Sequence, residues 1–416
     1  MTRPHERIAR LSPSLAEGPF LTASVIRLLI LAVAVSTLGP AFLWPLTALY
    51  VHRVLQEPLT VAGLILTGQA AAGLGASLAS GIGYDGWGAR LPTLFFLGLM
   101  AIGLTAVALE RDLTVYAAGA VLTGLGAGGI SPAFNALAAS LRSQDGRGAF
   151  NAVYVAANAG VAVGASAGGF LAARSFGLAF AGAAAVLIVL WLVMWGWARG
   201  GQWGRPVRLE AIGAGGWLRA AALRQVGGPT FVWAAALGLQ WLAYAQWEIT
   251  VPNFMRNQGI PLPLYSVLWT MNTVLILALQ PLLSRLTAHV PRITSQLIAG
   301  SALLVAALAT LTQARTYPAY LAAMVFATLG EMLVLPGVPA QAAAHAAPEG
   351  RGLAQGVISM GGSLGRMVGP LLGGLLYGTG SQPLLFGVMG AIMAVGAVGY
   401  VLGDRMAAAP TSPRAG

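Results

Sequence analysis

The chain has 416 residues, of which 57% are apolar and only 8% charged, with a mean hydropathy of +0.76. This composition excludes an ordinary water-soluble globular domain. The formal net charge of +11 would suggest a nucleic-acid partner in a soluble protein, but all 23 basic residues are arginines that lie mostly in loops. There is no cysteine, and the four histidines are scattered, so we expect no disulfide, metal or cofactor site.

Apolar runs bounded by charged or turn residues predict membrane-spanning helices, since a span needs about 20 mostly apolar residues. In chain order, the predicted spans cover residues 23–49, 59–83, 91–109, 113–139, 148–173, 177–198, 229–255, 263–287, 293–312, 317–345, 352–377 and 382–403. The sequence therefore predicts an all-α polytopic membrane protein with twelve transmembrane helices.

The polar stretches divide these spans into two six-helix lobes. We expect a cytoplasmic N-terminal tail over 1–22, lobes over 23–198 and 229–403, a cytoplasmic linker over 199–228 and a cytoplasmic tail over 404–416. The N-terminal segment lacks a short apolar core with a cleavage site, which favours a retained tail over a signal peptide. The linker either forms a short amphipathic helix on the inner headgroups or is an unstructured tether.

The arginines predict the orientation, because basic short loops stay in the cytoplasm. With both termini inside, sixteen arginines fall on the cytoplasmic side. The five on the outer side are Arg53, Arg111, Arg174, Arg256 and Arg315. Heavy use of Arg, Ala and Gly also suggests a bacterial genome rich in G and C, so we expect a multi-pass protein of the bacterial cytoplasmic (inner) membrane.

An internal repeat relates the two halves. The segment DGRG at 145–148 precedes an apolar run with glycines at 160, 164, 168 and 169, and the segment EGRG at 349–352 precedes a run with glycines at 365, 369, 373 and 374. Two tandem six-span lobes with a central site between them form a known transporter architecture.

These features resemble the major facilitator superfamily, and more narrowly its bacterial drug-efflux-like members. The family's loop after the second span has the pattern G-x-x-x-D-R-x-G-R-R, and residues 81–90 read GIGYDGWGAR. The matching residues are Gly81, Asp85, Gly88 and Arg90. The resemblance implies that this gating loop contacts span 11, with Asp85 at the positive end of a neighbouring helix.

Two positions depart from the family. Ala120 stands where many proton-coupled members carry an arginine in span 4, and Ala165 stands where the antiporter motif of span 5 has a proline. Span 11 keeps the intact motif, with Pro370. The usual residues for proton antiport are therefore incomplete.

Three ionisable residues lie well inside predicted spans, where a charge costs roughly 2.5–3.5 kcal/mol or more unless it faces a cavity or a partner. They are Glu248, Glu331 and Arg366. Glu331 and Arg366 lie at similar depth, which leaves three alternatives: an ion pair broken when Glu331 takes up a proton, a permanent pair that fixes helix packing, or two residues that never meet. Glu248 is a third site residue or, after a small boundary error, a surface acid among the outer headgroups.

Other polar or aromatic residues are candidates for a cavity wall. Tyr154 and Asn158 share a helix face because they are four residues apart. The further candidates are Trp241, Gln246 and Asn272. Hydrogen bonds between helices explain the same residues without a ligand.

The sequence has no H-E-x-x-H, G-x-S-x-G or G-x4-G-K-S/T pattern, so we expect neither an enzyme nor a nucleotide-driven pump. We expect a secondary transporter, most simply a monomer that exchanges protons for amphipathic or cationic compounds. The alternative is a uniporter or symporter of one metabolite. The expected partners are a small-molecule substrate, protons and the lipid bilayer.

Overall fold

The computed structural model describes residues 23–43, 50–52, 54–140, 148–172, 174–199, 226–290, 292–347 and 350–408. Nearly all of these residues are helical, and no strand occurs among them. The expected N-terminal tail, most of the linker and the end of the C-terminal tail lie outside the described residues, as do Asp145, Arg147 and Glu349 of the repeat.

The helices follow the predicted spans closely. The first half contains α1 (Ala23–Leu43), α3 (Leu59–Trp87), α4 (Arg90–Leu109), α5 (Leu113–Ser140), α6 (Gly148–Ala172) and α7 (Phe176–Arg199). The second half contains α9 (Gly228–Tyr244), α10 (Gln246–Ile249), α11 (Val251–Asn257), α12 (Leu262–Ala288), α13 (Ile293–Gln313), α14 (Tyr317–His345), α15 (Arg351–Tyr377) and α16 (Gln382–Ala408). The span expected at 229–255 is thus broken into three pieces, and α16 continues beyond residue 403.

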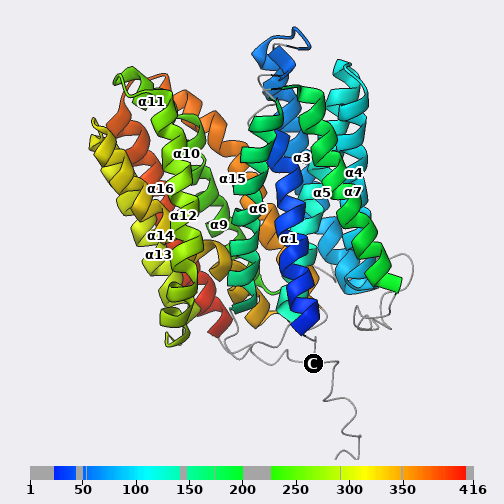
Figure 1. Ribbon diagram of the computed structural model, residues 1–416. Coiled ribbons are helices and arrows are strands. Elements are labelled where there is room, and N and C mark those ends of the chain that lie inside the picture. Colours follow the sequence, from blue (N-terminus) through cyan, green and yellow to red (C-terminus); the bar gives the residue numbers. More distant parts are fainter. Residues whose placement is uncertain are drawn as a thin grey trace, which may run out of the picture.

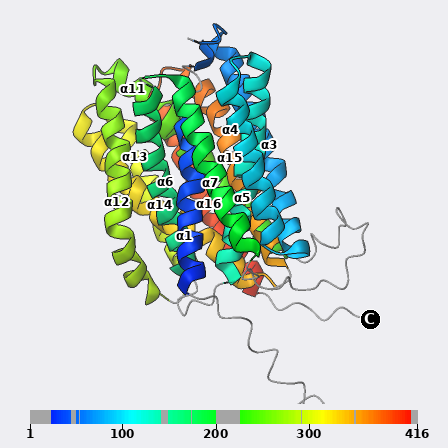
Figure 2. The ribbon, with the colours of Figure 1, turned by 45° about the vertical axis from the view of Figure 1, so that its right-hand side comes forward.

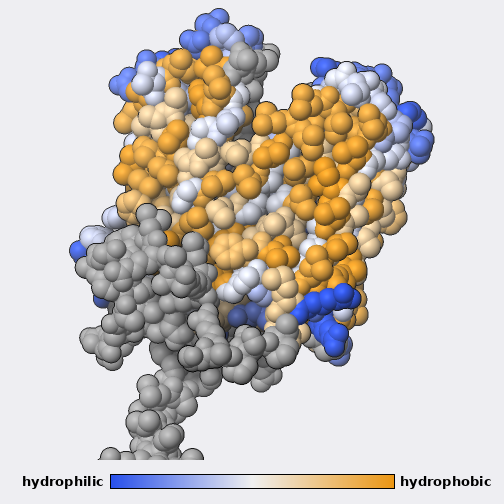
Figure 3. All heavy atoms as spheres, turned by 180° about the vertical axis from the view of Figure 1, so that it is seen from behind, coloured by the Kyte–Doolittle hydropathy of each residue, from blue (hydrophilic) through white to orange (hydrophobic). Residues whose placement is uncertain are grey.

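The outer surface of the bundle is apolar. Nine of the described helices are long and apolar enough to cross a membrane. The bundle carries highly exposed apolar side chains, such as Leu109 of α4 and Leu375 of α15, each 75% exposed. Figure 3 shows hydrophobic residues over the flank of the molecule and hydrophilic residues gathered near its two ends. Exposure on this scale is stable only against lipid.

Each half has its own hydrophobic core, so the molecule consists of two lobes. Leu97, Phe180 and Leu187 are buried in the core of the first lobe, and Trp233, Tyr320 and Phe386 in the core of the second. The helices of both lobes run roughly parallel to one long axis (Figure 1, Figure 2).

The repeated glycines bring helices into backbone contact within each lobe. A Cβ atom on Gly160 or Gly164 of α6 would meet the Ala34 or Leu38 carbonyl oxygen of α1, and one on Gly369 of α15 would lie 2.8 Å from the Leu242 carbonyl oxygen of α9. The two copies of the repeat therefore have the same packing role, because the first packs α6 on α1 and the second packs α15 on α9.

The lobes meet along α15, which packs against α3 and α5, and along α12 and α14, which pack against α6. They approach at the end where α15 and α6 begin, called here the closed end, and diverge toward the end that carries α11, called the open end (Figure 1). The surface is hollowed between the lobes at the open end (Figure 3).

Candidate functional site

The gating loop lies at the closed end. Both carboxylate oxygens of Asp85 accept hydrogen bonds, one from the backbone N–H of Gly352 and one from that of Leu353, at 2.7 Å each. These donors belong to the first turn of α15, where an anion interacts favourably with the helix dipole. Gly88 ends α3 with φ +78°, which a glycine adopts without strain, and Arg90 is exposed at the start of α4.

Glycines allow the two lobes to touch beside this loop. A Cβ atom on Gly352 would lie 2.5 Å from the Gly81 carbonyl oxygen, and one on Gly356 would lie 2.7 Å from that of Ser77. These atoms are backbone and cannot move aside as a side chain would. The contact between α3 and α15 therefore requires glycine at these positions.

Two further polar contacts join the lobes at the closed end. The Arg351 guanidinium donates to the Ala139 carbonyl oxygen in the last turn of α5 (3.4 Å), and the Asn151 amide of α6 donates to the Ser284 hydroxyl of α12 (2.8 Å). The closed end is thus held by helix packing and a small number of hydrogen bonds.

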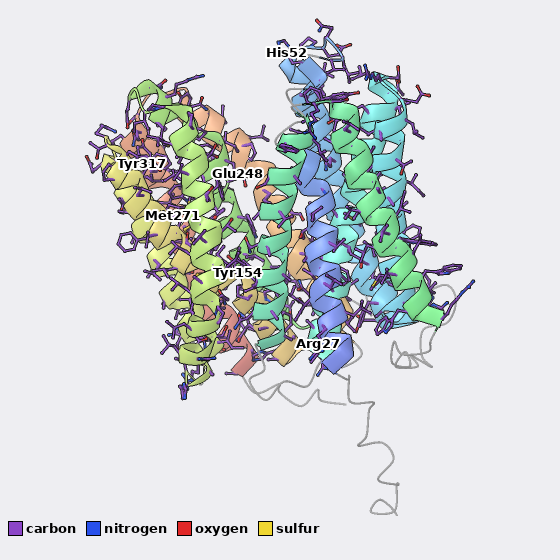
Figure 4. The ribbon with its side chains drawn as sticks, viewed as in Figure 1. Arg27, His52, Tyr154, Glu248, Met271 and Tyr317 are labelled. Atoms are coloured by element: carbon purple, nitrogen blue, oxygen red, sulfur yellow. The ribbon has the colours of Figure 1, made fainter. Side chains whose placement is uncertain are left out.

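Glu331 is the middle residue of α14 and only 4% exposed. Its carboxylate accepts a hydrogen bond from the Asn272 amide of α12, which also donates to the Thr328 hydroxyl. The hydroxyl groups of Tyr244 on α9 and Tyr154 on α6 approach the same carboxyl group. Tyr154 belongs to the other lobe, so this cluster spans the lobe interface (Figure 4).

The Tyr154 hydroxyl is a buried polar atom that completes no hydrogen bond. It lies close to the Glu331 carboxyl group without reaching a bonding geometry. An unsatisfied buried hydroxyl costs free energy, so this contact between the lobes is one that a small movement would change.

The structure does not bring Glu331 and Arg366 into a salt bridge, so of the three alternatives it agrees with the one in which the two residues do not meet. The Arg366 guanidinium lies over the Trp241 ring, 4.4 Å from its centroid, and interacts electrostatically with Glu248. Similar depth does not fix the direction in which a side chain leaves its helix. Helix α14 turns Glu331 toward α12 and α6, and α15 turns Arg366 toward α9 and α10.

Glu248 lies on α10, at the break in the seventh span, and its side chain is partly buried. Figure 4 shows it between the lobes, nearer the open end than Tyr154. Its position beside Arg366 favours the prediction of a site residue over that of an isolated surface acid. The exposed side chain of Arg366 and the half-buried ring of Trp241 lie on the same side of the second lobe.

The candidates for the cavity wall have different surroundings. Gln246 is fully buried and donates to the Gly369 carbonyl oxygen of α15 (2.9 Å), so its amide joins α10 to α15. Asn272 is buried and supports Glu331, and the Asn158 amide donates to the Tyr154 carbonyl oxygen of its own helix (2.9 Å). Interhelical or local hydrogen bonds thus account for these amides.

Tyr244 is a residue that sequence reasoning missed. It follows Trp241 by three positions, which places both rings on one face of α9, 5.5 Å apart and edge to face. A small internal cavity of about 10 Å³, roughly the space of one water molecule, is bounded by Tyr244, Glu331 and Gln240. The Gln240 side-chain oxygen is buried there without a partner.

Comparisons with known proteins agree with this architecture. The sequence model of the Major Facilitator Superfamily matches residues 29–330 and 236–416. YttB, an uncharacterized MFS-type transporter of Bacillus subtilis (strain 168), is 34% identical over 356 residues, which cover 84% of this chain and 88% of the relative. The chain belongs to the major facilitator superfamily.

Solved structures of this superfamily share the fold at low sequence identity. A bacterial homologue of the iron transporter ferroportin in an outward-facing state has a TM-score of 0.75 and 14% identity, and covers 91% of this chain and 99% of its own. The human organic anion transporter MFSD10 (TETRAN) has a TM-score of 0.72 and 16% identity over 90% of this chain and 98% of its own. This MFS chain is therefore a multi-pass membrane protein of the secondary-transport type.

The departures noted in the sequence have clear places in this MFS fold. Ala120 is buried in α5, and Ala165 lies on α6 beside Gly164, where α6 packs on α1. No group of three or more His, Asp or Glu residues capable of holding a metal occurs within the described part of the chain. The ionisable side chains described between the lobes are Glu248, Glu331 and Arg366.

Proposed function

We propose that the chain is a proton-coupled efflux transporter of amphipathic or cationic compounds that works by alternating access, with Glu331 as its proton site. The observation that carries the proposal is the setting of Glu331, which is buried at the middle of α14, accepts a hydrogen bond from the Asn272 amide and is approached by two phenols. Among the described residues, no salt bridge joins it to a basic side chain. A carboxylate in such a position is costly unless it is neutralised by a proton or by a bound cation.

The contact with Tyr154 links this proton site to the lobe interface. Proton uptake removes the charge and turns the carboxyl group into a hydrogen-bond donor, which changes its interaction with the unsatisfied Tyr154 hydroxyl across the interface. A group whose protonation changes a contact between lobes biases the equilibrium between conformations. Proton binding and lobe movement are coupled in this way.

The surface around Arg366 supports an amphipathic substrate. Trp241 and Tyr244 offer aromatic faces, Glu248 offers an acid, and Arg366 already lies over one of the rings. Aromatic faces and carboxylates both attract organic cations. A flat, positively charged compound would compete with Arg366 for the same ring.

The closed end is proposed to face the cytoplasm. The distribution of arginines supports this orientation, with both termini inside and the protein in a bacterial cytoplasmic membrane. The structure would then represent an outward-facing state. The fold similarity to a ferroportin homologue solved in an outward-facing state is consistent with that assignment.

Uptake of a fluorescent lipophilic cation into inside-out vesicles with an acidic interior tests the proposal. Wild-type protein is expected to accumulate the dye only while the proton gradient lasts. Glu331→Gln should reduce accumulation to that of vesicles without the protein, whereas Glu110→Gln, the same change on an exposed loop, should have no effect. Undiminished gradient-driven uptake by Glu331→Gln would remove this residue as the proton site.

Ala120 and the opposite charges of Glu248 and Arg366 favour a second candidate, a uniporter or symporter of one metabolite. Paired charges of opposite sign suit a zwitterionic solute better than a simple cation. Failure of the wild-type protein to accumulate any of several lipophilic cations would favour this candidate.

A further inference from the structure

A second cavity lies at the open end of the first lobe, apart from the space between the lobes. It has a volume of about 180 Å³ and forms where the end of α4 and the start of α7 meet Tyr50 and Val54. The helices that line it belong to one lobe. The transport mechanism proposed above makes no use of it.

Two arginines line this cavity, Arg111 from the loop after α4 and Arg174 from the loop before α7. Both side chains are exposed, and within the described residues no salt bridge joins either of them to an acid. The neighbouring Asp112 carboxylate accepts hydrogen bonds from the Thr114 and Val115 amides (2.8 and 3.0 Å), which hold it at the start of α5. Two like charges in one cavity repel each other, and an anion between them removes that cost.

The rest of the wall is aromatic or weakly polar. Tyr50 packs edge to face on Phe176 and Phe180, with ring centroids 5.5 and 4.8 Å apart, and Ser175 adds a hydroxyl group. The Arg174 guanidinium lies over the Phe170 ring at 4.6 Å, which leaves the N–H groups at its edge available. The cavity therefore offers a rigid apolar wall beside a pair of guanidinium groups.

Lipid-facing side chains flank the cavity. Leu109, Phe170 and Leu178 are 75%, 62% and 51% exposed. These residues lie in the terminal turns of α4, α6 and α7, within four residues of the arginines, and helix ends of membrane spans are where headgroups meet acyl chains. A phosphate group bound by the arginines would thus have a hydrophobic surface directly beneath it.

We propose that Arg111 and Arg174 form a binding site for a phosphate group, carried either by an anionic phospholipid or by free phosphate. Guanidinium groups bind phosphate oxygens in a bidentate manner, and two of them can hold one phosphate from opposite sides. The position at the headgroup level and the flanking apolar surface favour the phospholipid. This inference is independent of the proposed transport mechanism.

Thermal unfolding of the full-length protein in neutral detergent, titrated with dispersed phosphatidylglycerol, phosphatidylcholine or inorganic phosphate, tests the site. Phosphatidylglycerol is expected to raise the unfolding temperature in a saturable manner, and phosphatidylcholine to have a much smaller effect. Each substitution, Arg111→Gln or Arg174→Gln, should weaken the response about tenfold or more, as the loss of a charge-assisted hydrogen bond predicts.

Arg256→Gln is the matched control, because Arg256 is an exposed arginine at the open end of the other lobe. It should leave the titration unchanged. Saturation by inorganic phosphate alone, lost in the arginine variants, would support the site and identify a free anion as its ligand. Two outcomes would overturn the proposal. One is an equal response of the wild type and of the double variant Arg111→Gln/Arg174→Gln, and the other is no response of the wild type to phosphatidylglycerol or to inorganic phosphate.

Discussion

At the scale of single residues, Asp85 holds the closed end through backbone donors. Because its partners are the N–H groups of Gly352 and Leu353, no side chain of α15 is needed for the contact. The same N–H groups would otherwise be unpaired at the start of a helix. Asp85 therefore accepts hydrogen bonds from these N–H groups only while the lobes are together. Its carboxylate caps α15 in this conformation and would lose that role when the closed end opens.

Asp85→Asn is expected to shift the protein toward opening at the closed end, because the amide loses the charge and offers one acceptor oxygen in place of two. The loss of a charge-assisted hydrogen bond corresponds to about a tenfold change in the equilibrium. Ala340→Cys provides the readout. Ala340 lies on α14 of the second lobe, packs against the core of the first lobe and is only 1% exposed, and the chain has no other cysteine. Maleimide labelling of Cys at this position should become about tenfold faster.

Asp112→Asn is the control for this experiment, since Asp112 caps α5 within one lobe. Hydrogen bonds from the Val115 amide, and then the Thr114 amide, hold the pKa of Asp112 below its ordinary value. The stability it adds is therefore present above the pKa of the unfolded chain and is lost as the pH falls through the lower, folded value. Asp112→Asn should remove that acid sensitivity without changing the labelling rate; equal acceleration by both variants would indicate general loosening.

At the scale of helices, α15 packs closely against two neighbouring helices through two pairs of glycines. Gly352 and Gly356 face α3 of the other lobe, whereas Gly365 and Gly369 face α9 of its own. Under the proposed mechanism, the first pair makes a contact that transport breaks and remakes, whereas the second pair makes a contact within one lobe.

The sequence predicted the helices and the Asp85 contact because apolar length and a local motif determine them. It could not predict which way side chains turn around a helix axis, so Glu331 and Arg366 have different partners from the expected pair. The break at Ala245 also escaped prediction, because the apolar run continues through it. Gln246 is a related case, since the sequence does not show whether a glutamine amide faces a cavity or bonds to a neighbouring helix, as it does here.

Gly356→Ala should keep α3 and α15 apart, because the new Cβ atom would lie 2.7 Å from the Ser77 carbonyl oxygen. Transport is expected to fall strongly, and labelling of the Ala340→Cys reporter to increase. Gly374→Ala on the same helix is the control, since a Cβ atom there meets nothing within 4 Å and alanine is the better helix former. Normal transport by Gly356→Ala would show that the helices do not need this close approach.

At the scale of the whole molecule, the lobe interface is weak compared with the lobes themselves. Each lobe has a large buried core of its own, whereas the polar contacts between lobes at the closed end come from Asp85, Arg351 and Asn151. A typical hydrogen bond contributes only about 0.5–1.5 kcal/mol net. Separation of the lobes at the closed end, which the proposed alternating access requires, would therefore break only a small number of polar contacts.

Cross-linking the lobes at the closed end should stop transport reversibly. Asn151 of α6 and Ser284 of α12 are joined by a 2.8 Å hydrogen bond, so the double variant Asn151→Cys/Ser284→Cys places two thiols within reach of a short thiol cross-linker. The cross-linked protein is expected to transport nothing and to recover when a reductant cleaves the linker. Asn257→Cys/Tyr377→Cys, a pair joined within the second lobe (2.9 Å), should transport before and after cross-linking. Full transport by the protein cross-linked between α6 and α12 would mean that the closed end never opens, and rocking of the two lobes would then be the wrong description of this chain.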